Sequence, residues 1–165
     1  MSIRNPTELE KHFGNIPLEH IIRNNILDKN ENNVLHAAIV FNDVNKYYIS
    51  QLEIFNHSKN NKGNTPLHLA CAKGDSVFLY YLIHKYALNI YETNNKGYNL
   101  LDVAIIFKQK DIINILIKYY YTEDKRIFKS INEEICNLQY LKEAFNEKEI
   151  EYISKCFTKD NLSSI

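Results

Sequence analysis

The sequence of 165 residues predicts an all-α solenoid of helix-turn-helix repeats with short β-hairpin-like loops and helical caps. The first observation behind this prediction is a complete short unit between Asn61 and Asp75. Thr65 suits the N-cap of a helix and Pro66 suits the first helical position, where a missing N–H costs nothing. Gly74 suits the end of that helix. Such a unit is too small to bury its own apolar face, so it needs neighbours.

The second observation is that the unit repeats. Asn95-Lys96-Gly97 matches Asn61-Lys62-Gly63 at a spacing of 34 residues, and Leu35-His36-Ala37-Ala38 matches Leu67-His68-Leu69-Ala70 at a spacing of 32. A period near 33 with the signature T-P-L-H-x-A resembles the ankyrin repeat, which consists of a β-turn and two antiparallel helices. The resemblance covers roughly residues 28–120.

The resemblance implies a single domain of five segments. Residues 1–27 form an N-terminal helical cap, and residues 28–59, 60–93 and 94–121 form three repeats. Residues 122–165 are either a degenerate repeat or an unrelated helical cap. In the N-terminal cap, Thr7 can begin one helix and Pro17 can open a second.

Each repeat should contain an inner and an outer helix. We expect inner helices at 34–41, 66–73 and 100–107, and outer helices at 44–52, 76–85 and 111–120. Leu67, Leu69 and Ala70 begin an apolar face that should be buried. Gly63 and Gly97 should adopt positive φ at the turns. Glu31 replaces the turn glycine of the first repeat, so that hairpin should differ in shape.

Composition limits the classes of partner. The formal net charge is +0, so no overall field draws the chain to nucleic acid or to an anionic membrane. No apolar run is long enough to span a bilayer. The three cysteines form no C-x-x-C pair, and their odd count suits a reducing compartment. We expect a cytoplasmic monomer, located in the host cytoplasm if the protein acts on host proteins. Cys71 lies inside the best repeat, where a buried apolar role is expected.

Candidate catalytic residues are few. The resemblance implies that His36 and His68 form hydrogen bonds within and between the loops, rather than acting as metal ligands or as a general base. Asp102 replaces the third equivalent residue, which argues against a metal site. No phosphate-binding loop or nucleophile elbow occurs. We therefore expect no enzyme activity, no cofactor and no bound metal.

One pattern points to a binding surface. Phe41, Lys73, Phe107 and Phe145 each lie eight residues after a capping position. The resemblance places these positions on the concave side, where partners dock, with Tyr91 and Tyr98 at the rim. Alternatively, the rings pack against neighbouring inner helices or the caps.

The function that the resemblance implies is binding of a partner protein through the concave face and the hairpin tips. Composition and size suggest a viral or bacterial protein that modulates host proteins. One alternative is a substrate- or enzyme-recruiting adaptor whose C-terminal helices carry a second activity. Another is a spacer without a partner, although apolar residues on the concave face argue against that role.

Overall fold

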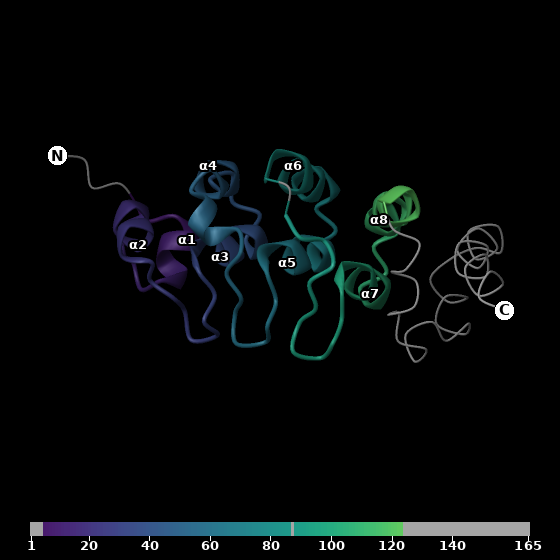
Figure 1. The fold of residues 1–165 in the computed structure, drawn as a ribbon. Helices are drawn as coiled ribbons and strands as arrows, with labels where there is room; N and C mark the ends of the chain where they lie inside the picture. The colour runs from purple at the N-terminus through teal and green to yellow at the C-terminus, as the bar shows by residue number, and fades with distance from the viewer. Residues whose placement is uncertain (1–4, 87, 124–165) are drawn as a thin grey trace, which may run out of the picture.

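The computed structural model describes residues 5–86 and 88–123, with side chains as far as Leu116. Helices are arranged in two rows along a solenoid (Figure 1). The inner row consists of α3 (Val34–Val40), α5 (Pro66–Lys73) and α7 (Leu100–Ile106), and α5 packs against both of the others. The outer row consists of α4 (Lys46–Ser50), α6 (Ser76–Tyr86) and α8 (Lys110–Glu123). The predicted all-α solenoid is confirmed.

Two short helices precede the first repeat. They are α1 (Glu8–His12) and α2 (Leu18–Asn24). Glu10 N–H donates to Thr7 Oγ1 over 3.2 Å, and Thr7 N–H donates to Glu10 Oε2 over 2.8 Å. This reciprocal capping box satisfies two N–H groups that a helix start leaves unpaired, and it confirms the predicted helix start at Thr7.

The first outer helix is shorter than predicted. We expected it at 44–52, whereas α4 is followed by a separate 3₁₀ turn, η1 (Glu53–Phe55). Asp43 Oδ1 accepts a hydrogen bond from Asn45 N–H over 2.8 Å and Asp43 O accepts one from Lys46 N–H over 3.1 Å, so a tight turn precedes the helix. Helix α4 therefore begins only at Lys46.

The core lies between the two rows of helices. Its fully buried large side chains include Leu35, Ile39, Phe78, Leu82 and Leu101, and the Cys71 side chain is also fully buried, as predicted. The expectation that Leu67, Leu69 and Ala70 of α5 are all buried was partly wrong. Leu67 is buried, but Leu69 is only half-buried because it points away from the helix pair toward the hairpin side.

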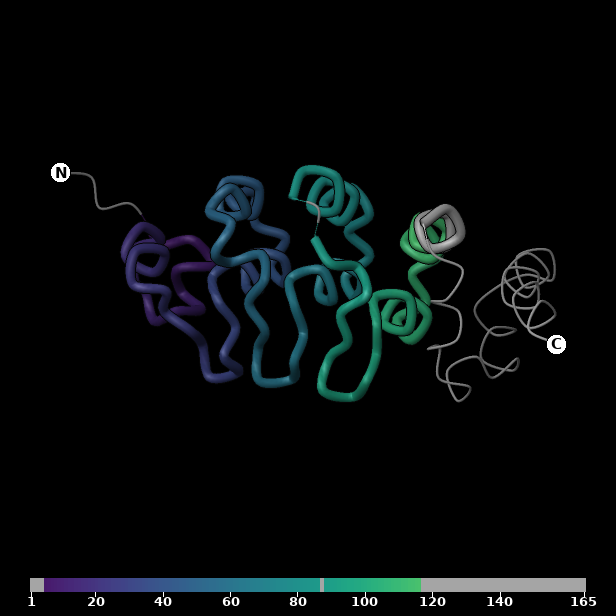
Figure 2. Tube along the Cα trace, in the orientation of Figure 1, coloured from purple at the N-terminus to yellow at the C-terminus, as the bar shows by residue number. Residues whose placement is uncertain are grey.

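Three hairpin loops project from the inner row (Figure 2). Each is organised by one side-chain oxygen, from Asp28, Asn60 or Asn94, that accepts N–H groups two and four residues later. The backbone N–H of the same residue donates to the carbonyl four residues later, over 3.0 Å in all three loops. The three loops thus share one hydrogen-bonding pattern.

The first hairpin does not differ in shape, so that expectation was wrong. Gly63 and Gly97 have the predicted positive φ, at 73° and 78°, and Glu31 adopts the same left-handed region with φ 59°. Glu31 N–H donates to Asp28 O over 2.9 Å, as Gly63 N–H does to Asn60 O over 2.8 Å. The bonds to Asp28 therefore hold a non-glycine residue in a conformation that costs about 1–2 kcal/mol.

Candidate functional site

The hairpins are joined to one another by a ladder of hydrogen bonds. Asn61 N–H donates to Asn30 O over 3.0 Å, and Asn95 N–H donates to Lys62 O over 3.1 Å. Side-chain amides extend the ladder, because Nδ2 of Asn60 donates to Asn32 Oδ1 and Nδ2 of Asn94 donates to Asn64 Oδ1. The ladder fixes the spacing of the hairpin tips and so gives the surface beside them a defined shape.

Two buried histidines connect the inner helices to these hairpins. Nε2 of His36 lies 2.9 Å from Asn64 O, and Nε2 of His68 lies 3.2 Å from Tyr98 O. Since a carbonyl can only accept, each Nε2 carries the proton and donates. Burial lowers the pKa of both rings, that of His36 to about 4. Both ring nitrogens of each histidine have partners, because Nδ1 contacts the helix cap. The structural role predicted for these histidines is confirmed.

Asp102 occupies the equivalent position on α7. Its Oδ2 accepts the N–H of Asn99 over 2.9 Å, while Oδ1 is buried without a hydrogen-bond partner in the part of the chain that the structure describes. Burial raises the pKa of this carboxyl to about 6. A buried polar atom without a partner is unfavourable, so Asp102 is a weak point of the third repeat.

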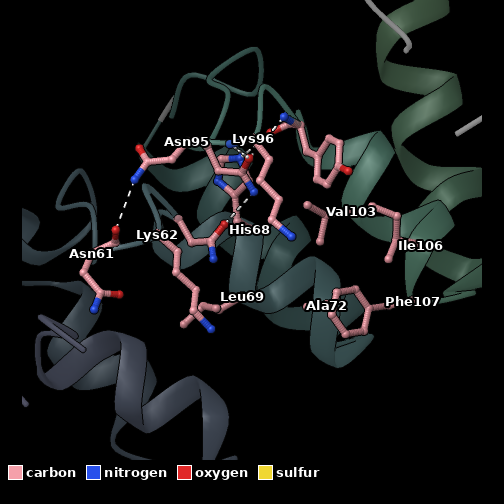
Figure 3. A pocket seen from close by; sticks show the side chains of 13 residues that line it. Asn61, Lys62, His68, Leu69, Ala72, Asn95, Lys96, Val103, Ile106 and Phe107 are labelled. Atoms are coloured by element: carbon pink, nitrogen blue, oxygen red, sulfur yellow. Dashed lines mark hydrogen bonds between the residues drawn. The ribbon is translucent and has the colours of Figure 1, made fainter. Parts of the chain in front are cut away.

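A hollow of about 610 Å³ lies on the hairpin side of α5 and α7. Figure 3 shows its floor and its rim. Leu69 and Ala72 of α5 and Val103, Ile106 and Phe107 of the α7 end form the floor, while the hairpins at 60–64 and 94–98 supply the rim with Asn61, Lys62, Asn64, Asn94, Asn95, Lys96 and Tyr98. The hollow therefore combines an apolar floor with a polar rim, an arrangement typical of a docking surface.

The candidate binding residues that the sequence predicts do not all lie at the same place in the structure. Phe107, which is 55% exposed, and Tyr98 both line the hollow. Phe41 is 42% exposed, and its ring centroid lies 5.0 Å from that of His12 in the N-terminal cap. Lys73 and Tyr91 are exposed but do not line this hollow. Phe41 is thus partly packed against a cap, as the alternative interpretation supposed, and the hollow brings together only two of the five described candidates.

Sequence reasoning missed most of the floor. Leu69 and Val103 lie four residues before Lys73 and Phe107, one helical turn away on the same face. Extending the predicted stripe by that spacing would have found both. The sequence pattern predicts Lys62 and Lys96 only as turn residues, although their equivalent positions in successive hairpins also indicate a pair of charges at the rim.

Other chemistry is sparse in the described parts of the chain. Within residues 5–86 and 88–123, no group of three His, Cys, Asp or Glu side chains could hold a metal ion. Burial raises the pKa of the Cys71 thiol, which keeps it protonated. No helix between residues 5 and 123 is long and apolar enough to cross a membrane. Residues 124–165 of the predicted final segment lie outside the described residues. Phe145 and the C-terminal helices that the alternative hypothesis credits with a second activity belong to this part of the chain.

With its stacked helix pairs and hydrogen-bonded hairpins, the chain has the architecture of a solenoid repeat protein. The family model for ankyrin repeats (3 copies) matches residues 12–93 and 35–127, more than half of the chain. The chain belongs to the ankyrin-repeat family. A search of curated proteins gave no match. Ankyrin repeats generally mediate protein–protein interactions and are typically not enzymes.

Proposed function

We propose that the chain binds a partner protein through the face formed by its inner helices and hairpin tips, with the hollow between α5, α7 and two hairpins at the centre. The observation that carries this proposal is the exposed ring of Phe107 at the edge of an apolar floor. Exposed apolar surface is unfavourable in water and is a common feature of contact sites. Interface energy is usually concentrated in a few such side chains.

Rigidity of this face supports the proposal. The hairpins on either side of the hollow are held by the bonds from Asn95 N–H to Lys62 O and from Asn95 Nδ2 to Asn61 O, both 3.1 Å long. On the helix side, Nε2 of Gln109 donates to Ala72 O over 2.9 Å and ties α5 to the start of the third outer helix. A preformed surface loses little conformational entropy on binding, so more of the contact energy remains as affinity.

Site-specific photo-crosslinking tests this function. A photoreactive phenylalanine derivative is placed at Phe107 in the full chain and, as the matched control, at Val77 on the outer helix α6, which is 70% exposed. After irradiation in cell lysate, we expect a discrete protein adduct from position 107 that excess unmodified chain suppresses. Equal adducts from both positions, or none from position 107, would contradict the proposal.

A further inference from the structure

The hollow combines its apolar floor with an unbalanced charge. Among its lining residues are two lysines, Lys62 and Lys96, and no aspartate or glutamate. The two lysines hold equivalent places in successive hairpins, one residue before the turn glycine. Figure 3 shows that both side chains extend from the hairpins across the hollow, Lys62 toward Leu69 and Lys96 toward Val103. The lysines thus place two positive charges beside a surface of aliphatic and aromatic groups.

Neither ammonium group has an acidic partner within the described residues. The nearest ion pair along the chain joins Lys59 Nζ to Glu92 Oε1 over 3.4 Å, and a second, between Lys46 and Asp75, lies on the other side of the inner row. Lys62 and Lys96 form their hydrogen bonds through the backbone. Each N–H donates to an asparagine side chain of its own hairpin, and Lys62 O accepts the N–H of Asn95. Both side-chain charges therefore remain available to a ligand.

Building on the proposed function, we propose that the hollow binds a segment of a partner protein that presents one or two carboxylates beside a large apolar side chain. The apolar side chain contacts Leu69, Val103 and Phe107, and the carboxylates pair with Lys62 and Lys96. Charge complementarity of this kind selects between partners and accelerates association. A segment with a basic residue at the same place is rejected, because like charges in a hollow repel strongly.

Charge also distinguishes a protein segment from a nucleic acid. A phosphodiester backbone is bound through many cationic contacts, and the affinity for it comes largely from counterion release. The hollow offers two lysines beside five apolar or aromatic floor residues, and the whole chain has a formal net charge of +0. The observations therefore favour a segment with few charges and an apolar anchor.

Selection from a random peptide library displayed on phage tests the proposal with the full chain as bait. We expect the enriched peptides to combine Asp or Glu with Leu, Ile, Phe or Tyr. Synthetic copies of the best peptides should bind at least about fivefold more weakly to Lys62→Glu and to Lys96→Glu, and the loss should shrink as salt is raised. An oligonucleotide of equal charge should not displace them.

Lys29→Glu is the matched control. Lys29 is an exposed lysine on the first hairpin, and it lies outside the hollow. The control makes the same change in net charge and should leave peptide affinity unchanged. If Lys29→Glu weakens binding as much as Lys62→Glu, or if the enriched peptides lack acidic residues, the acidic-apolar assignment is wrong.

The Phe107→Ala variant separates this assignment from the proposed function. Neutral or basic peptides that bind the wild type and lose binding to Phe107→Ala would overturn the assignment while leaving the docking surface in place. Displacement by the oligonucleotide would likewise overturn the choice of a protein segment. Failure to enrich any peptide that depends on Phe107 would contradict both proposals.

Discussion

Nε2 of His36 lies 2.9 Å from the carbonyl oxygen of Asn64, a residue 28 positions further along the chain. This bond joins the first inner helix to the second hairpin, and the bond from His68 to Tyr98 O repeats it one unit later. Replacing His36 by Leu leaves the carbonyl without this donor, which should reduce the free energy of unfolding by about 1–3 kcal/mol. Urea denaturation measures this change. His57→Leu, at an exposed position, is the control and should change it by less than about 0.5 kcal/mol.

Acidification should destabilise the protein through the same histidine. Burial lowers the pKa of His36 from 6.5 to about 4 in the folded state, so the unfolded chain binds the proton first. The stabilisation is present above pH 6.5 and is lost as the pH falls toward 4. Urea denaturation between pH 4 and 8 should show this loss, and His36→Leu should make the dependence shallower. An unchanged slope in the variant would mean that His36 is not buried in its neutral form.

Asp102 should have the opposite pH dependence. Burial raises its pKa from 3.8 to about 6, so the folded state binds the proton first as the pH falls. The contribution of protonated Asp102 to the free energy of unfolding is therefore fully present below pH 3.8 and is lost as the pH rises through 6. Asp102→Asn removes the buried charge and should increase the free energy of unfolding at pH 7 by about 1–3 kcal/mol. The gain should disappear below pH 3.8, where both side chains are neutral. A loss of stability at pH 7 would show that the hydrogen bond from Asn99 N–H to the carboxylate outweighs the cost of burying its charge.

The two turn glycines should respond differently to a methyl group. A Cβ at Gly63 would lie 2.7 Å from the backbone nitrogen of Asn95, whereas among the described residues a Cβ at Gly97 meets nothing within 4 Å. Both substitutions carry the cost of a left-handed conformation, about 1–2 kcal/mol. Gly63→Ala should cost more than Gly97→Ala, because it also disturbs the bond from Asn95 N–H to Lys62 O. Thermal denaturation measures both, with Lys96→Ala as the neutral control. Equal losses would contradict the close approach of the hairpins.

Most of the fold could be predicted from the repeat period. A helix cap such as Thr65 and a turn such as Asn61–Gly63 depend only on neighbouring residues in the sequence, and both recur in register. The shape of the first hairpin was predicted wrongly, because Glu31 adopts the conformation expected of a glycine. Its N–H donates to Asp28 O, and residue types alone do not reveal this bond. Phe41 and Phe107 occupy equivalent positions in the sequence, yet His12 of the N-terminal cap lies against only the first. Which equivalent positions form a hollow depends on the neighbours in the stack.

The central claim is that the surface around Phe107 holds a partner protein. The most direct measurement is the dissociation constant, by isothermal titration calorimetry, of the partner identified by crosslinking at position 107. We expect Phe107→Ala to weaken binding by more than about 1 kcal/mol, or at least about fivefold, without lowering the melting temperature. Val77→Ala on the outer helix should leave the affinity unchanged. An unaltered dissociation constant for Phe107→Ala would contradict the claim.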